Sequence, residues 1–64
     1  MPGWNAVETQ RLAIAPGYTG VIGQRGRWWI GWIDEIRGVN SQGETRDELI
    51  DNLGSALEDA LEMR

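Results

Sequence analysis

Residues 27–45 read RWWIGWIDEIRGVNSQGET, and this stretch decides the fold. It opens on a run of tryptophan and isoleucine, residue types that favour β-strands. Glycines at positions 38 and 43 then indicate turns. At its end, Thr45 is followed three residues later by Glu48, which is the spacing of a helix capping box. The stretch therefore predicts a strand, a turn, then either another short strand or a second turn, and finally the start of a helix.

The strand predicted at residues 27–34 is apolar on both of its faces. Successive side chains point to opposite faces of a strand, so each face receives large apolar groups. Gly31 has no side chain, and we expect its face to be the one that another element approaches closely. A strand of this kind must be covered twice. The helix-covered face is predicted to hold Trp29, Gly31 and Ile33, and the opposite face to hold Trp28, Ile30 and Trp32.

A second strand is predicted immediately upstream. Residues 18–24 read YTGVIGQ, and Arg25-Gly26 would supply a tight turn, which together give an antiparallel hairpin. Pro16-Gly17 marks another turn just before it. The segment of residues 1–17 is predicted to be either an extra strand or a flexible arm.

The helix predicted from Thr45 is amphipathic. Its apolar residues recur at spacings of three and four and form one wide face suited to lie across a sheet. Gly54 interrupts the helix, and we interpret it as a point of close approach to the hairpin. The apolar set is Leu49, Ile50, Leu53, Ala56, Leu57, Ala60 and Leu61, and the acidic face carries Asp51, Glu58, Asp59 and Glu62.

These elements predict a small α+β domain: an antiparallel sheet of three strands, with room for a fourth, and one helix packed on one face. A 64-residue chain buries only roughly 60% of the surface that its unfolded form exposes. The chain has no cysteine and no histidine, so disulfides and imidazole or thiolate metal sites cannot supplement the core. We therefore expect a homodimer or higher oligomer.

Composition also restricts the function. The formal charge is −4, which disfavours direct nucleic-acid binding without an added domain. No apolar run reaches the length of a membrane span and no leader is recognisable, so a cytoplasmic location is expected. Asp34, Glu35 and Glu44 lie near predicted turns, but no lysine, histidine or cysteine accompanies them as a base or nucleophile. We expect neither an enzyme nor a bound cofactor.

The order of motifs resembles that of the HicB antitoxin family. The elements that carry the resemblance are the aromatic strand at residues 29–33, Glu35-Ile36 with Gly38, the Gln42-Gly43-Glu44-Thr45 step, and a helix rich in Glu, Ala and Leu. The resemblance extends over residues 18–63, so residues 18–64 would form a HicB-like domain. It implies a reduced ribonuclease-H-like fold and a role in a toxin–antitoxin system.

In such a system the antitoxin neutralises a small basic, HicA-like toxin that cleaves messenger RNA, by covering the toxin's active site.

The sequence departs from the family's pattern in two ways. The loop before Gly38 has Asp34 and Arg37 where the family often has prolines, and the chain ends on the first helix, so autonomous operator binding is not expected. The alternative is an orphan self-associating structural module with no toxin partner.

Two surfaces remain open to several interpretations. The face of Trp28, Ile30 and Trp32 could bind a second copy or a partner, could be covered by the N-terminal segment, or could stack nucleobases. For the last of these, Arg25 and Arg27 are thin cationic support. The acidic helix face could be a solvated surface or could steer a basic toxin by charge.

Overall fold

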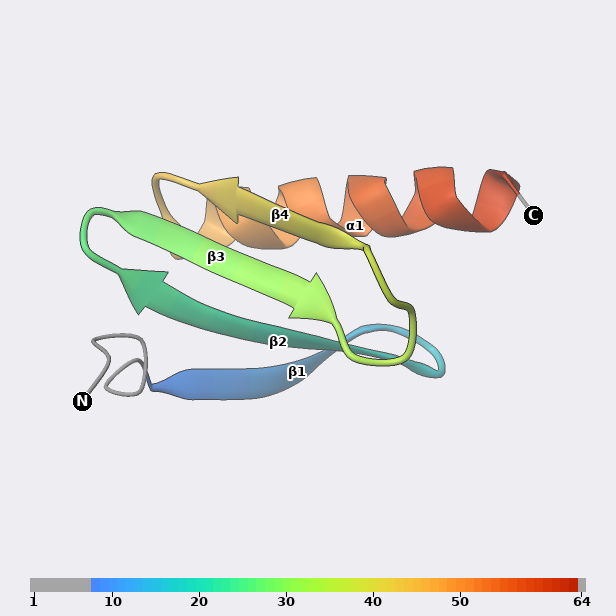
Figure 1. Ribbon diagram of the computed structural model, residues 1–64, viewed down its shortest axis with the longest axis horizontal. Coiled ribbons are helices and arrows are strands. Elements are labelled where there is room, and N and C mark those ends of the chain that lie inside the picture. The colour runs from blue at the N-terminus through green and yellow to red at the C-terminus, as the bar shows by residue number, and fades with distance from the viewer. Residues whose placement is uncertain (1–7, 64) are drawn as a thin grey trace.

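The computed structural model describes residues 8–63 and has the predicted α+β architecture (Figure 1). A four-stranded antiparallel sheet in the order β1-β2-β3-β4 carries one helix, α1. Strand β1 is the possible fourth strand of the prediction. Residues 1–7 of the expected N-terminal segment lie outside the described residues. The elements are β1 (Thr9–Ala15), β2 (Tyr18–Arg25), β3 (Trp28–Ile33), β4 (Asn40–Gly43) and α1 (Arg46–Glu62).

Two glycine turns connect the first three strands. At the β1–β2 turn, Pro16 is followed by Gly17 with φ 82°, which suits a type II turn and agrees with the prediction. The β2–β3 turn differs from the prediction by one residue. Gly26 has φ 61°, and Arg25 pairs with Trp28, so the turn consists of Gly26 and Arg27 rather than Arg25 and Gly26. Glycine at the first of two turn positions is the type II′ pattern, which matches the twist of a hairpin.

Strand β1 contains a bulge, and this bulge brings two consecutive residues to the helix side. The register with β2 shifts between Ala13 and Ala15. Ile14 and Ala15 consequently both pack against the core. Ile14 lies over Gly20, where an added Cβ would be 2.6 Å from Ile14 Cγ1. The bulge gives the strand the local bend that bulges usually produce.

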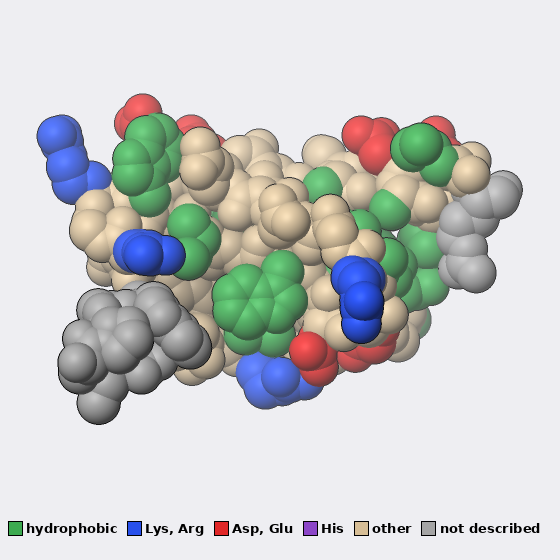
Figure 2. Space-filling model, viewed as in Figure 1, with side chains coloured by type: hydrophobic (Ala, Val, Ile, Leu, Met, Phe, Trp, Pro, Cys, Tyr) green, Lys and Arg blue, Asp and Glu red, His purple; other side chains and the backbone are tan. Residues whose placement is uncertain are grey.

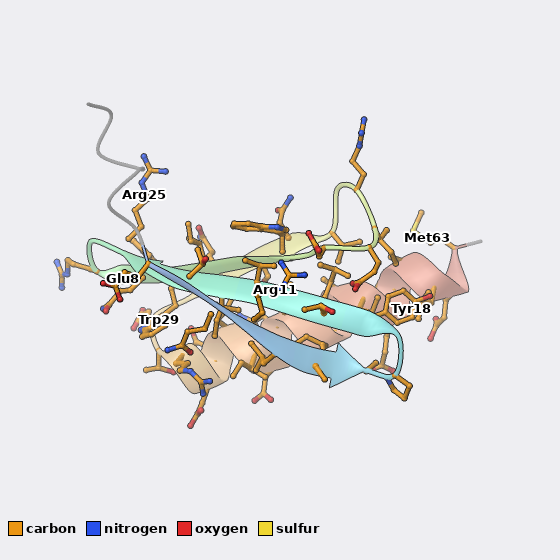
Figure 3. The ribbon with its side chains drawn as sticks, turned by 90° about the horizontal axis from the view of Figure 1, so that it is seen from below. Glu8, Arg11, Tyr18, Arg25, Trp29 and Met63 are labelled. Carbon is orange, nitrogen blue, oxygen red and sulfur yellow. The ribbon has the colours of Figure 1, made fainter. Side chains whose placement is uncertain are left out.

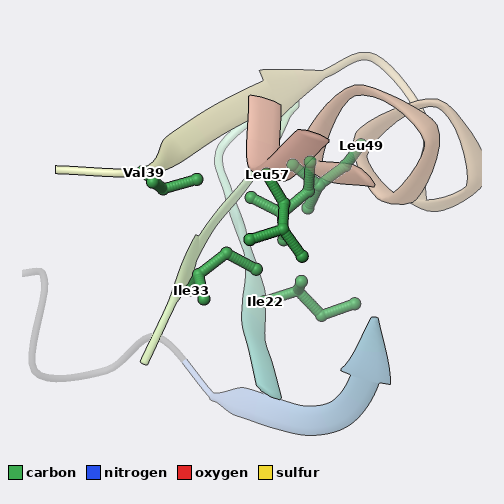
Figure 4. Close-up of a cluster of buried hydrophobic side chains, with 6 residues drawn as sticks. Ile22, Ile33, Val39, Leu49 and Leu57 are labelled. Atoms are coloured by element: carbon green, nitrogen blue, oxygen red, sulfur yellow. The ribbon is translucent and has the colours of Figure 1, made fainter. Parts of the chain in front are cut away.

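The core lies between the helix and the inner side of the sheet (Figure 4). Three leucines one turn apart on α1 are buried against isoleucines from β2 and β3. Burying such a side chain contributes roughly 1.5–3 kcal/mol each. Trp29, Gly31 and Ile33 lie on this side, as predicted: Ile33 is in the core, Trp29 packs against it, and a Cβ on Gly31 would be 3.4 Å from Leu49 Cδ2. The cluster is Ile22, Ile33, Val39, Leu49, Leu53 and Leu57.

The start of α1 confirms the predicted cap. Thr45 is extended and its hydroxyl accepts from the Glu48 N–H at 3.0 Å. The Glu48 carboxylate accepts in return from the N–H of Glu44 at 2.8 Å, one residue earlier than in the standard capping box. At the other end, the helix extends past β4, and Leu61 is 36% exposed although the pattern predicted it on the apolar face (Figure 1). Within residues 8–63, no helix is long and apolar enough to cross a membrane.

The sheet curves round the helix, so β4 and β1 lie on opposite flanks of α1 (Figure 4). The β4 flank is closed. An added Cβ at Gly43 would be 2.7 Å from the backbone nitrogen of Leu49, and Asn52 Nδ2 donates to the carbonyl of Gln42 at 2.9 Å. The β1 flank is looser. Among residues 8–63, one side-chain hydrogen bond joins it to the helix, from Arg46 Nε to Gln10 Oε1 at 3.3 Å.

The interpretation of Gly54 as a point of close approach is wrong. An ideal Cβ built at Gly54 has no atom within 4 Å, so the position has open space beside it. The glycine that the helix backbone approaches closely is Gly43, at the end of β4. Sequence pattern alone could not separate them, because a glycine's spacing does not reveal what lies opposite.

Replacing these two glycines should therefore change stability in opposite directions. Gly54→Ala should raise the free energy of unfolding by about 0.5–1 kcal/mol, because alanine is the better helix former and nothing obstructs its methyl group. Gly43→Ala should lower it by about 1–3 kcal/mol, because the methyl group would collide with the helix backbone. Urea denaturation followed by tryptophan fluorescence measures both, and a destabilised Gly54→Ala variant would contradict the assignment.

Candidate functional site

The side of the sheet turned away from α1 is the first candidate surface, and we call it the convex face. It holds Trp28, Ile30 and Trp32, as predicted. Trp28 is 46% exposed and Trp32 41% exposed, and Ile30 is half-buried. Hydrophobic and basic side chains are interspersed over this side of the molecule, and acidic ones gather towards its margins (Figure 2). Two large indoles open to solvent on one face are typical of a binding surface.

Val21 was not singled out from the sequence, yet it forms the buried centre of the convex face. Its cross-strand neighbours are Arg11 on β1 and Trp32 on β3. Val21 is only 5% exposed although no helix lies over it. Side chains of directly opposite residues on neighbouring strands lie close enough to cover one another. The convex face is therefore partly covered by its own residues, with the two indoles standing at its surface.

Arginines border the convex face. Arg25 points to the side of the sheet opposite Trp29, which lies towards the helix (Figure 3). Arg11 Nη2 contacts Asp34 Oδ2 at 2.7 Å, and both side chains are exposed. The hydrogen bond to Asp34 and the charge of that carboxylate hold the pKa of Arg11 above its usual value. An exposed pair of this kind contributes little to stability, but it links β1 to the residue that follows β3.

The loop between β3 and β4 is anchored by Glu35. The N–H of Thr19 donates to Glu35 Oε1 at 2.6 Å, and the N–H of Asp34 donates to the carbonyl of Thr19 at 2.9 Å. The bond from Thr19 lowers the pKa of Glu35 below its ordinary value. A shallow depression of about 460 Å³ runs along this loop, from Trp32 to Asn40. Among residues 8–63, no three carboxylates gather as a metal site, and the contacts of Asp34 and Glu35 give them structural roles.

The outer side of α1 is the second candidate surface, and we call it the acidic face. Its predicted members, Asp51, Glu58, Asp59 and Glu62, are all exposed. Residues 44–62 carry seven carboxylates and one arginine, a formal charge of −6, whereas residues 8–43 carry four arginines and three carboxylates, a formal charge of +1. Within residues 8–63 the one salt bridge joins Arg11 and Asp34, so the helix carboxylates are not neutralised by ion pairs there.

Part of the acidic face borders a groove on the β1 flank of the helix. Asp51 and Glu58 line this groove, which has a volume of about 390 Å³, together with Ser55. Asp59 and Glu62 do not line it. Its remaining lining comes from Ala13 and Ile14 of β1 and from Ile50 and Gly54 of the helix. The sequence pattern gave no sign of this groove, because its walls come from two elements whose relative position depends on the curvature of the sheet.

The chain matches no family model, no curated protein and no solved structure in the three comparisons made with known proteins. The resemblance of residues 18–63 to HicB antitoxins therefore remains a prediction from the sequence. The two surfaces, their charges and their exposure are the structural observations from which a function can be argued.

The anchoring of the loop by Glu35 should make stability depend on pH. Because the folded-state pKa of Glu35 is lowered, its contribution is fully present above the ordinary value of about 4.5 and is lost as the pH falls through the folded-state pKa. Glu35→Gln should therefore reduce stability at pH 7 and have progressively less effect below about pH 4.5. Urea denaturation at several pH values measures this difference. Parallel pH profiles for the two proteins would contradict it.

Proposed function

We propose that this protein is an antitoxin-type binding protein, which neutralises a small basic RNA-cleaving toxin by covering its active site. It acts by stoichiometric binding and not by catalysis. The observation that carries the proposal is the uncompensated charge of α1 together with the residues just before it, −6 over residues 44–62 on exposed side chains. The resemblance to HicB antitoxins, over the same helix and the strands before it, supports the same conclusion.

The charge of the helix suits the chemistry of such a toxin. A protein that cleaves RNA must present a cationic surface, because neutralising phosphates supplies much of the affinity for a nucleic acid. A rigid helix that carries carboxylates on successive turns offers that surface a competing set of anions. The two charge patterns attract over several ångströms and accelerate association. Apolar contacts then have to hold the complex, since rim charges act more on association than on dissociation.

Reversing charge on the acidic face should slow binding to the toxin. The triple change Asp51→Lys, Glu58→Lys and Asp59→Lys should reduce the association rate at least about tenfold at low salt and flatten its salt dependence, because steering falls with ionic strength. The probe is the product of a neighbouring reading frame that encodes a small basic protein, and stopped-flow fluorescence measures the rate. Co-expression with this protein should restore growth.

A matched pair of single changes controls for net charge. Glu58→Lys and Glu8→Lys alter the total charge equally, but only Glu58 lies on the acidic face. Only Glu58→Lys should slow association appreciably. Association rates equal to that of the unchanged protein, for both single variants and for the triple variant, would contradict steering. A neighbouring reading frame that encodes another type of protein would favour the second candidate function.

Self-association through the convex face is the second candidate function, and the exposure of Trp28 and Trp32 favours it. Tryptophans are the residues most often responsible for affinity at interfaces. A small domain with one helix also gains most from covering its second sheet face. The two functions are compatible, because a second copy on the convex face leaves the acidic face free.

The double change Trp28→Thr and Trp32→Thr should weaken self-association at least about 100-fold, because each indole is removed twice in a symmetric dimer. Threonine keeps the preference for a strand. Met63→Thr is the control, since Met63 is 86% exposed but lies at the end of the helix. Sedimentation equilibrium measures the dissociation constants. A wild-type protein that stays monomeric at every accessible concentration would contradict this function.

A further inference from the structure

The outer edge of β1 and the groove beside it form a third surface. β1 is a terminal strand of the sheet, and within residues 8–63 no strand pairs with its outer edge. In an antiparallel strand with one neighbour, alternate N–H and C=O groups point away from that neighbour. The seven residues of β1 therefore present a row of hydrogen-bonding groups to whatever lies beside them.

The opposite edge of the sheet, formed by β4, is closed. At β4 the helix approaches the backbone closely at Gly43, and Asn52 caps the carbonyl of Gln42. At β1 the space next to the helix is the groove of about 390 Å³. Gly54 has no atom within 4 Å of its Cβ position on this flank. Because the sheet curves round α1, a strand added to β1 would continue that curve and lie against the helix.

We propose that the edge of β1 accepts an extended segment of a basic partner protein as a fifth strand, with its alternate side chains in the groove. The apolar part of the groove, Ile14 and Ile50, suits the aliphatic stems of arginine or lysine. Asp51 and Glu58 lie where the charged ends of those side chains would arrive. Strand addition gains affinity from main-chain hydrogen bonds and specificity from alternate side chains.

Charge also selects among occupants. A second copy that added its own β1 would place Gln10, Leu12 and Ile14 on the groove side, with no cation for Asp51 and Glu58. It would also bring two helices, each with a formal charge of −5 over residues 46–62, towards each other. Like charges brought close together oppose association. A basic segment from another protein satisfies both the edge and the groove. This inference extends beyond the proposed function, because it requires a basic strand and not a particular toxin.

The dimensions are compatible with this occupant. Groove-side residues of a strand recur roughly every 6.7 Å. Asp51 and Glu58 are separated by seven residues of helix, a rise of roughly 10.5 Å. A strand with a cation at each groove-side position can therefore reach both carboxylates with its flexible side chains.

The test uses the full-length protein and a synthetic probe, the capped nonapeptide TRVRTRVRT, which is basic and prone to form a strand. Binding is measured by fluorescence anisotropy of a labelled peptide. Asp51→Asn with Glu58→Gln should weaken binding about fivefold, on the order expected for two exposed ion pairs. Asp59→Asn with Glu62→Gln makes the same change in charge away from the groove and should weaken binding less than about twofold.

Two further measurements separate strand addition from charge attraction alone. Peptides N-methylated at every second amide, in each of the two phases, should differ, because only one phase blocks the bonds to β1. Amide hydrogen exchange should show that bound peptide protects alternate residues of β1. Equal weakening by both charge pairs, equal binding of the two N-methylated peptides, or protection elsewhere would overturn the proposal.

Concentration-dependent protection of β1 without peptide would also overturn it, since a second copy would then be the occupant. The outcome is separate from that of the toxin experiments. A protein that rescues growth without binding the peptide retains the proposed function and lacks the strand site. One that binds the peptide but no toxin has the reverse result.

Discussion

The burial of three leucines of one helix in the hollow of a four-stranded sheet is the constraint on which the rest of the structure depends. Leu49, Leu53 and Leu57 are buried, and the sheet curves round them (Figure 4). Residues 8–63 contain no second helix that could cover the other side. The convex face therefore keeps its two tryptophans at the surface, shielded in part by their own strand neighbours. An incomplete cover is thus a consequence of the fold's size, and it is the physical reason to expect association.

The amphipathic helix also determines how charge is distributed. Its inner side is committed to the core, so every carboxylate on it projects to solvent, and the arginines of the strands lie elsewhere. The protein is acidic overall, yet residues 8–43 are slightly cationic. Net charge alone would describe both sides of the molecule as equally repulsive to a nucleic acid or equally attractive to a basic protein. The structure shows that the excess of exposed carboxylates lies on the helix side.

Much of the fold could be predicted because the signals were local. The capping box at Thr45, the Pro16-Gly17 turn and the alternation along β3 depend on neighbouring residues, and the structure confirms all three. The sequence does not distinguish strand β1 from a flexible arm, because its bulge turns Ile14 and Ala15 to the same side and breaks the period of two. The prediction for Gly54 is wrong because the sequence does not show which side of the helix faces the hairpin at that position. The groove, the anchoring of Glu35 and the burial of Val21 depend on contacts between distant segments.

The closed and open edges of the sheet follow from the same curvature. β4 is short and precedes the helix directly, so the chain must return to α1 at once, and Gly43 allows the two backbones to meet. β1 is separated from the helix by three strands and reaches its other flank only through the bend of the sheet. That flank consequently receives side chains rather than backbone, and a groove remains between Ile14 and Ile50. Because the convex face and the β1 edge have different orientations, association at the convex face leaves the groove of Asp51 and Glu58 open. The two proposed kinds of association, self-association and the binding of a basic partner, therefore use different parts of the same fold.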